Sequence, residues 1–306
     1  MKEITVFSPA TVANVVCGID IFGFALNDPN DKLIIRMTNR KGVAIINKDN
    51  FLLPDSPEKN VIGVALLALL NEVPEEIGFE VESYKTIKPG SGIGSSAASA
   101  AGAVVGANHL LNNLFSKIDL VRFAMQGEMI ASGAIHADNV APCIYGGMTL
   151  VRCSDPLDII SISSPPLFVT IMHPEIEIRT SDAREILKKQ LLLKDAIQQW
   201  GNVAGLVAGF LKEDYDLISR SLVDIIVEPV RSILIPAFDE LRNKSKMVGA
   251  LGGGISGSGP SIFMLSKDES TAKDVQAAME DIYKKINLDF NSYVTTINNT
   301  GVKINK

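Results

Sequence analysis

A short run of small residues, PGSGIGSSAASAAGA at positions 89–103, constrains the fold more than any other part of the chain. Before it, residues 79–87 alternate apolar and polar side chains as a strand does, and after it residues 99–115 are apolar at helical spacing. A flexible glycine-serine connector would have polar sequence on both sides. The segment therefore predicts a strand, a glycine-serine loop and a buried helix in direct succession.

This succession is typical of an anion-binding loop. Glycine allows positive φ and a close approach to a ligand, successive N–H groups can converge on an anion, and the first turn of a helix adds unpaired N–H donors. Ser95, Ser96 and Ser99 offer hydroxyls to phosphate oxygens or to a cation. The loop holds no lysine for a Walker motif, and its alternating glycines do not match the dinucleotide-binding pattern. It predicts a phosphate loop of another kind.

Composition narrows the classes of function. The chain has 306 residues, 46% of them hydrophobic, and a net charge of -6 with no basic run, which argues against nucleic acid as a partner. The beginning, MKEITVF, does not have the pattern of a signal peptide. The longest apolar run, at 61–70, is too short to span a membrane and predicts a buried helix with Asn60 as its N-cap. Cys17, Cys143 and Cys153 lack metal-ligand spacing, so a reducing cytoplasm is the simplest interpretation.

The succession of elements predicts two α+β domains, residues 1–160 and 161–306, because neither half shows regular βαβ alternation. The double proline at 165–166 favours a boundary near residues 155–166. In the first half we expect strands at ITVFSPAT, FGFAL, DKLIIRMT and GVAII, helices at 60–72 and 116–132, the latter with a Ser116–Asp119 capping box, and a strand pair beginning at Cys143. In the second half we expect the strand LFVTIMHP, then helical sequence at 181–212 with a break near Lys194, a helix ended by Pro229 and a helix at 235–245. These are followed by a strand, glycine turn and strand at 247–266, a helix at 270–285 and one last strand at 292–304.

Three further segments concentrate polar residues or glycine. In residues 7–26, Asn14 and Asp20 are polar groups in an apolar run; they indicate either a ligand site or an edge strand with a turn. In residues 127–147, His136, Asp138 and Asn139 indicate either a ligand site or a polar turn. The segment 251–265 has more glycine than a hairpin turn needs, which favours close approach to a ligand or to the phosphate loop.

Together these four segments resemble the motifs of the GHMP kinases. PGSGIGSSAA is similar to their phosphate loop PxxxGLGSSAA, SPATVANVVCGID to their first motif, and LGGGISGSGPSIFML to their glycine-rich third motif, in the family's order from residue 4 to 265. The closest resemblance is to the branch that phosphorylates L-homoserine, whose motifs include PATSANLGPGFD, GHPDNVAPALYGG, TSEAR and EPxR. The chain departs from these motifs at Val15, Val16, Cys17, Ile19, Lys188 and Lys189. We hypothesise that the first three changes alter the stiffness of the loop beside the amino-acid site.

The resemblance implies a two-domain fold. Its N-terminal domain would be the two-layer domain shared with a small-subunit ribosomal protein, its C-terminal domain would be ferredoxin-like, and the site would lie in the cleft between them. The implied reaction is transfer of the γ-phosphoryl group of ATP to the side-chain hydroxyl of L-homoserine, a step of threonine biosynthesis. The resemblance also implies a homodimer.

The resemblance also assigns residues to the nucleotide and its metal. Mg²⁺ would be bound by Ser96 and Glu128, although Glu128 can also be interpreted as an ordinary acid on a helix surface. Asn60 is a candidate adenine contact, and a plain N-cap explains it equally well. The phosphates would be bound by the loop and the start of its helix: Pro89, Gly90, Ser91, Gly92, Ile93, Gly94, Ser95, Ser96, Ala97 and Ser99.

For the amino acid, the resemblance assigns Arg184 and Arg231 to the carboxylate, with surface ion pairing as the alternative interpretation. The ammonium and hydroxyl ends would be held by Asn14, Asp20, His136 and Asp138, and Thr180 would contact the γ-phosphate or the substrate.

Asn139 stands where mevalonate-type relatives have an aspartate that is proposed as a base. An amide cannot usefully accept a proton, so we hypothesise direct transfer without a strong protein base. Asn139 would then orient the hydroxyl or bond to the transferring phosphoryl group.

Other functions remain open on this sequence. A kinase for another small alcohol, such as mevalonate or shikimate, would not need Asp20 and Asp138 to bind an ammonium group. A non-catalytic sensor on the same scaffold would be expected to lose Ser96, Glu128 or Asn139, and all three are present. An interaction module without a ligand leaves the glycine-rich loops unexplained.

Overall fold

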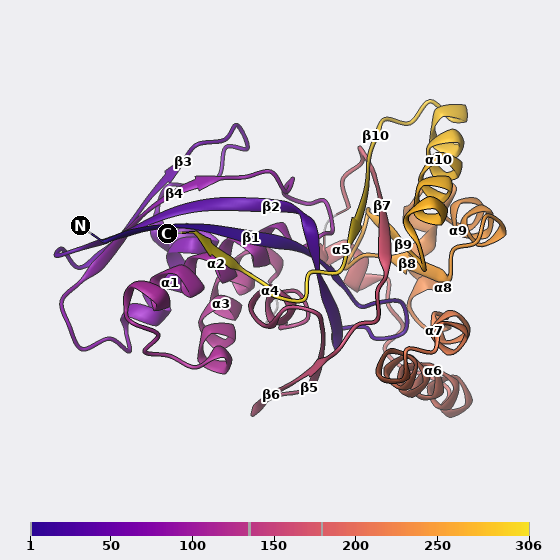
Figure 1. Cartoon of the computed structure of the whole chain (residues 1–306), viewed down its shortest axis with the longest axis horizontal. Coiled ribbons are helices and arrows are strands. Elements are labelled where there is room, and N and C mark those ends of the chain that lie inside the picture. The colour runs from indigo at the N-terminus through magenta and orange to yellow at the C-terminus, as the bar shows by residue number, and fades with distance from the viewer. Residues whose placement is uncertain (1, 134–135, 179, 306) are drawn as a thin grey trace.

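Two β-sheets organise the chain in the computed structural model, which describes residues 2–133, 136–178 and 180–305 (Figure 1). The larger, seven-stranded sheet has the order β11-β1-β2-β4-β3, and β5 pairs with the start of β2 and with β6. Its strands are β1 (Glu3–Ala13), β2 (Phe22–Thr38), β3 (Gly42–Asn47), β4 (Gly78–Tyr84), β5 (Met148–Ser154), β6 (Leu157–Ile162) and β11 (Lys303–Asn305).

Four helices cover one face of this sheet (Figure 1). The predicted buried helix is confirmed as α1, and Asn60 caps it by accepting a hydrogen bond from the N–H of Ile62 at 2.9 Å. The central helix α2 approaches the sheet closely, because a Cβ at Gly106 would lie 2.4 Å from the side chain of Ile35. Within the described residues, no helix combines the length and apolarity that crossing a membrane requires. These helices are α1 (Val61–Leu70), α2 (Ser95–Leu110), α3 (Lys117–Ser132) with the expected Ser116–Asp119 capping box, and α4 (Val140–Tyr145).

The smaller sheet has the strand order β10-β7-β9-β8, which is the antiparallel order of a ferredoxin-like domain. Alternate side chains of its strands enter two different cores. Ile262 and Met264 face helices α9 and α10, whereas Phe263 and Leu265 join a core that also contains residues of β1, β2, α6 and α7. Its elements are β7 (Phe168–Pro174), β8 (Gly252–Ile255), β9 (Ile262–Ser266), β10 (Phe290–Thr296), α5 (Thr180–Glu185), α6 (Leu193–Lys212), α7 (Tyr215–Ser221), α8 (Glu228–Arg231), α9 (Phe238–Met247) and α10 (Glu269–Lys285). The predicted α+β class with two sheets is confirmed.

The end of the chain returns to the first sheet. One last strand was expected at 292–304, but a turn around Gly301, with φ of 73°, divides this region into β10 and β11. β10 pairs with β7, whereas β11 pairs with β1. Residues 303–305 therefore complete a sheet that otherwise precedes residue 163, and the division at residues 160 and 161 stays a prediction.

Three other expectations were wrong. Cys143 lies in α4, not in a strand, and the strand begins at Met148. Pro229 occupies the first turn of α8 instead of ending a helix, because its missing N–H is not needed there. The two strands expected at FGFAL and DKLIIRMT form one strand, β2, and a register shift between Pro9 and Thr11 of β1 accommodates residues 26–29 of β2.

Candidate active site

The predicted phosphate loop joins β4 to α2. Gly90, Gly92 and Gly94 have φ of 75°, 81° and 68°, a region that favours glycine. A Cβ at Gly94 would lie 2.0 Å from Thr11 Oγ1, so the close approach also requires glycine. The loop leads directly into α2, a helix of 16 residues whose first-turn N–H groups have no partners within the helix. The expected strand, loop and buried helix are confirmed.

The glycine-rich turn between β8 and β9 packs against this loop. A Cβ at Gly92 would lie 2.5 Å from the carbonyl oxygen of Gly259, so the two backbones touch. The same turn contributes Gly257 and Ser258 to the lining of the cavity. The sequence left open whether this turn approaches the phosphate loop or a ligand. In the structure the turn contacts the phosphate loop and also lines the cavity.

A buried ion pair that sequence reasoning missed lies beneath the loop. Lys85 Nζ lies 2.5 Å from Asp31 Oδ2 and donates to Ser99 Oγ at 2.7 Å and to the carbonyl of Ser95 at 3.1 Å. Asp31 also accepts the N–H groups of residues 86 and 87, both at 2.9 Å. This pair ties the loop's entrance to the first turn of α2. The alternation of apolar and polar residues in β4, continued by one residue, could have revealed Lys85, because it places Lys85 on the same buried face as Val81.

Ser96 and Glu128 meet beside the loop. Glu128 is on α3, is 8% exposed and is hydrogen-bonded by Ser96, so its interpretation as a surface acid is wrong. Burial raises the pKa of Glu128 to about 7, and the Ser96 hydroxyl opposes that shift. A hydroxyl and a carboxyl group thus stand together at the N-terminus of α2.

The opposite end of the cavity carries paired charges. Arg184 donates to Asp20 through both terminal nitrogens, at 2.7 and 3.3 Å, and His136 Nδ1 lies 3.7 Å from the same carboxylate. Burial lowers the pKa of His136, although Asp20 opposes this. Asp138 is 4% exposed, and burial raises its pKa to about 7. Arg184 therefore forms an ion pair, as the alternative interpretation expected, and its partner is a residue of the cavity.

The turn of residues 14–20 supports this end of the site. Asn14 accepts the N–H of Asp20 at 3.0 Å and donates to the carbonyl of Gly257 at 2.7 Å. Arg231, which is 3% exposed, donates to the same carbonyl at 3.2 Å. Two of the residues that depart from the family motif, Val15 and Val16, have φ of 39° and 64°, which strains a β-branched residue. Burial of both side chains in the core between the sheets offsets this strain.

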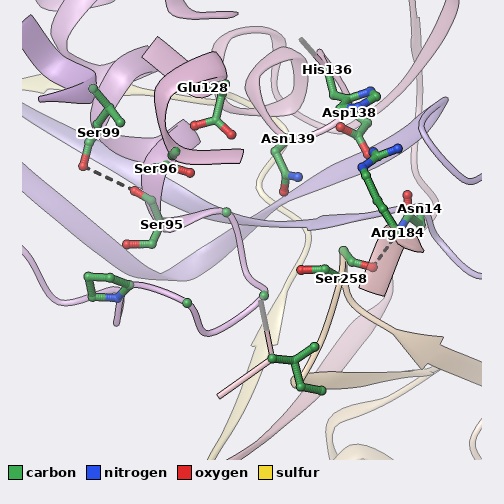
Figure 2. A pocket seen from close by; sticks show the side chains of 18 of the residues that line it. Asn14, Ser95, Ser96, Ser99, Glu128, His136, Asp138, Asn139, Arg184 and Ser258 are labelled. Atoms are coloured by element: carbon green, nitrogen blue, oxygen red, sulfur yellow. Dashed lines mark hydrogen bonds between the residues drawn. The ribbon is translucent and has the colours of Figure 1, made fainter. Parts of the chain in front are cut away.

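Asn139 lies between the two ends. Figure 2 shows it between the Ser96–Glu128 pair and the group formed by Asp138, His136 and Arg184. Its Oδ1 accepts the hydroxyl of Thr11 at 2.8 Å. That contact holds the amide oxygen toward β1 and leaves the amide nitrogen to face the cavity where the two ends meet.

One cavity of about 350 Å³ joins these groups. Sequence reasoning missed its apolar lining because Leu53, Val61, Ala131 and Ile178 look like ordinary core residues. Three predicted residues of the loop region, Ser91, Ile93 and Ala97, are not among the residues that line it. The lining is formed by Asn14, Asp20, Leu53, Val61, Lys85, Pro89, Gly90, Gly92, Gly94, Ser95, Ser96, Ser99, Glu128, Ala131, His136, Asp138, Asn139, Ile178, Arg184, Arg231, Gly257 and Ser258.

Two predicted contacts stay predictions. Asn60 is outside the lining, and its amide bonds to the N–H of Ile62 and to the carbonyl of Pro54. Thr180 begins α5, but its side chain lies outside the described part of the chain.

Comparison with known proteins agrees with this geometry. The model of the GHMP kinases N-terminal domain matches residues 60–147, and that of the GHMP kinases C-terminal domain matches residues 206–285. A homoserine kinase of Chloroherpeton thalassium is 44% identical over 99% of this chain and 100% of its own length, and one of Methanocella arvoryzae is 38% identical over 99% and 98%. The crystal structure of a homoserine kinase from Cytophaga hutchinsonii is 48% identical, covers 100% of this chain and 98% of its own, and superimposes with a TM-score of 0.95.

The chain therefore belongs to the GHMP kinases and, among them, to the homoserine kinases. It is an ATP-dependent small-molecule kinase. A mevalonate kinase structure with 16% identity and a TM-score of 0.69 shares the fold.

Proposed function

We propose that the chain transfers the γ-phosphoryl group of ATP to the side-chain hydroxyl of L-homoserine, giving O-phospho-L-homoserine. The observation that carries this proposal is the Asp20–Arg184 pair, which lies in the same cavity as the phosphate loop. Homoserine carries an ammonium group and a carboxylate, so it can replace the contact between the two side chains with one contact to each. Mevalonate and shikimate have no ammonium group to offer to Asp20.

In the proposed complex, the carboxylate of homoserine binds Arg184 and Arg231. An arginine fork matches a carboxylate in geometry and in charge. The ammonium group binds Asp20, supported by Asn14, which already holds the backbone of Asp20. His136 and Asp138 close this end of the cavity.

The nucleotide would occupy the other end. The N–H groups of residues 92–97 are the proposed donors to its phosphates. An apolar part of the cavity wall, formed by Leu53, Val61 and Ala131, suits a flat aromatic base. Adenine bound there would direct the γ-phosphate toward Asn139.

Ser96 and Glu128 are the proposed protein ligands of Mg²⁺. Both offer hard oxygen atoms, and a cation would favour the ionised form of a carboxyl group that burial now disfavours. Within the described residues, no group of three or more His, Cys, Asp or Glu side chains is arranged to hold a metal ion. Bound Mg²⁺ would neutralise charge on the phosphates.

The transfer itself would need positioning more than a base. Asn139 is the proposed contact for the hydroxyl or for the transferring phosphoryl group, as its place between the two ends suggests. The oxygen of the hydroxyl attacks the γ-phosphorus, the bond to ADP breaks, and the hydroxyl proton passes to the transferred phosphoryl group. Thr180 remains a proposed contact of the γ-phosphate or the substrate.

The direct test is release of ADP with Mg²⁺-ATP and one acceptor at a time: L-homoserine, L-threonine, L-serine, mevalonate or shikimate. Turnover with homoserine alone is expected. Turnover only with another alcohol would keep the phosphate loop and contradict the amino-acid site. A folded protein that binds ATP but turns over none of them would favour a sensor.

We also propose that the protein acts as a homodimer through α6, at the edge of the molecule (Figure 1). One side of this helix exposes an apolar stripe, here called the α6 stripe. A two-fold axis can place two copies of α6 antiparallel, so that the stripes of the two copies face each other. The stripe consists of Leu193, Ile197, Trp200 and Leu211, which are 57–68% exposed.

We also propose that the reaction takes place in the cytoplasm. Cys17, Cys143 and Cys153 are all free thiols, which suits the reducing cytoplasm.

A further inference from the structure

The phosphate loop is held from behind by its carbonyl groups. The carbonyls of three consecutive residues, 91–93, each accept a hydrogen bond from another segment. The first accepts both the hydroxyl and the N–H of Ser261, at 2.6 and 3.3 Å. The second accepts the hydroxyl of Ser256 at 2.7 Å, and the third accepts the N–H of Thr11 at 3.1 Å. Two of these three anchors come from the glycine-rich turn of the second sheet.

A buried histidine supports one of the anchors. His173 on β7 is 3% exposed, and its Nδ1 lies 3.1 Å from Ser261 Oγ. Since the Ser261 hydroxyl donates to the loop, Nδ1 must be the donor in this contact, which assigns the ring proton to Nδ1. Glu175, which directly follows the end of β7, pairs with Lys88 just before the loop. The second sheet thus holds the loop at several points.

The orientation of a carbonyl fixes the orientation of the next N–H. The peptide unit is planar and trans, so the C=O of one residue and the N–H of the following residue point in opposite directions. With the carbonyls of residues 91–93 directed at Ser261, Ser256 and Thr11, the N–H groups of residues 92–94 point away from these anchors. Gly92 and Gly94 line the cavity on that side.

We propose that Ser256 and Ser261 are positioning residues, which orient the N–H groups of Gly92 and Ile93 for the phosphates of the nucleotide. Glycine has little resistance to backbone rotation, so a loop of this composition needs outside bonds to keep one peptide orientation. Thr11 anchors the third carbonyl through its backbone. The two serines do so through side chains, so their role can be tested by substitution.

This inference rests on the proposed binding of ATP by the loop. The test measures binding of Mg²⁺-ATP by calorimetry without homoserine, followed by steady-state kinetics. In Ser261→Ala and in Ser256→Ala we expect the Kd of ATP to rise about fivefold to tenfold, the worth of one hydrogen bond. We expect the KM of homoserine to change by less than about twofold, because the substitutions leave its charged partners in place.

Ser266→Ala is the matched control. Ser266 is a fully buried serine on the same strand as Ile262, and its hydroxyl has no hydrogen-bond partner among the described residues. The inference is overturned if Ser256→Ala and Ser261→Ala bind ATP as tightly as Ser266→Ala, or if the KM values of ATP and homoserine rise equally. If Ser261→Ala fails to fold, Ser256→Ala tests the neighbouring peptide alone. If the unaltered protein does not bind ATP, the proposed function fails instead.

Discussion

Burial raises the pKa of three carboxyl groups in or near the cavity, Glu128, Asp138 and Glu228, to about 7. An acid with a raised pKa binds a proton more tightly in the folded state than in the unfolded state. Each group therefore stabilises the fold at low pH and loses that contribution as the pH rises toward 7.

Glu228→Gln should weaken this pH dependence. Glu228 accepts hydrogen bonds from Arg242 and from the N–H of Ile255, and both burial and the neighbouring Asp224 raise its pKa. Between the ordinary value of 4.5 and about 7, the folded state keeps a proton that the unfolded state releases. Urea unfolding from pH 5 to pH 7 should show a slope that is shallower in Glu228→Gln by up to about 1.4 kcal/mol per pH unit.

The exposed Glu240 provides the control for that titration. Identical slopes in Glu228→Gln and Glu240→Gln would contradict a raised pKa at Glu228.

Arg184→Gln should separate the two substrates kinetically. The change removes the proposed fork for the carboxylate of homoserine and leaves the phosphate loop intact. The KM of homoserine should rise about 10-fold to 100-fold, as expected for lost charged hydrogen bonds, with little change in the KM of ATP. Arg220→Gln, at an exposed position of α7, is the control. An equal rise in both KM values would show that Arg184 supports the whole site, not the amino-acid end.

At the scale of elements, the sequence predicts best what is decided locally. The strand, loop and helix around residues 89–103, the cap at Asn60 and the Ser116–Asp119 capping box all depend on neighbouring residues, and all are confirmed. The elements that were predicted wrongly are determined by tertiary pairing. Residues 27–30 favour a turn, yet pairing with β1 carries β2 past them.

The candidate site shows the same difference between what local sequence determines and what tertiary contacts determine. Motif residues such as Asp20, Arg184 and Asn139 are brought into one cavity as expected. Lys85 was missed because its partner Asp31 is 54 positions away in the sequence. The apolar wall was missed because nothing in an isolated valine or leucine distinguishes a ligand contact from core packing.

Asn60→Ala tests both the cap of helix α1 and the predicted contact of Asn60 with adenine. Loss of the cap on α1 should reduce the free energy of unfolding by about 1 kcal/mol, and Asn60→Ser should retain most of that contribution. Thermal unfolding measures this effect. Because Asn60 lies outside the lining, we expect the KM of ATP to stay unchanged. A raised KM in both variants would support the contact with adenine instead.

For the molecule as a whole, the cavity lies where loops and helices of the two halves meet, and one hydrophobic core joins the two sheets. Val12 and Phe24 of the first sheet share this core with Val169 and Phe263 of the second. The phosphate end of the site comes from the first sheet, whereas Arg184 and Arg231 come from the second half of the chain. Relative placement of the two halves therefore sets the distance between the nucleotide and its acceptor.

Trp200→Glu should convert the proposed dimer into a monomer. A charge at the centre of the α6 stripe would be buried without a partner in a two-fold interface. Sedimentation velocity measures the change in mass. Met247→Glu, on α9, is the control, since Met247 is 78% exposed and lies outside the stripe. A single mass for the unaltered protein and both variants would contradict this interface.

The return of β11 to β1 has a consequence for synthesis. Residues 303–305 are made after every other element described, yet they pair with a strand that begins at Glu3. At translation rates of about 5–20 residues per second, β1 waits about 15–60 s for this neighbour. During that interval its edge is open to other chains. Defects at residues 303–305 should therefore appear as aggregation of newly made protein, whereas molecules that escape it would bind both substrates normally.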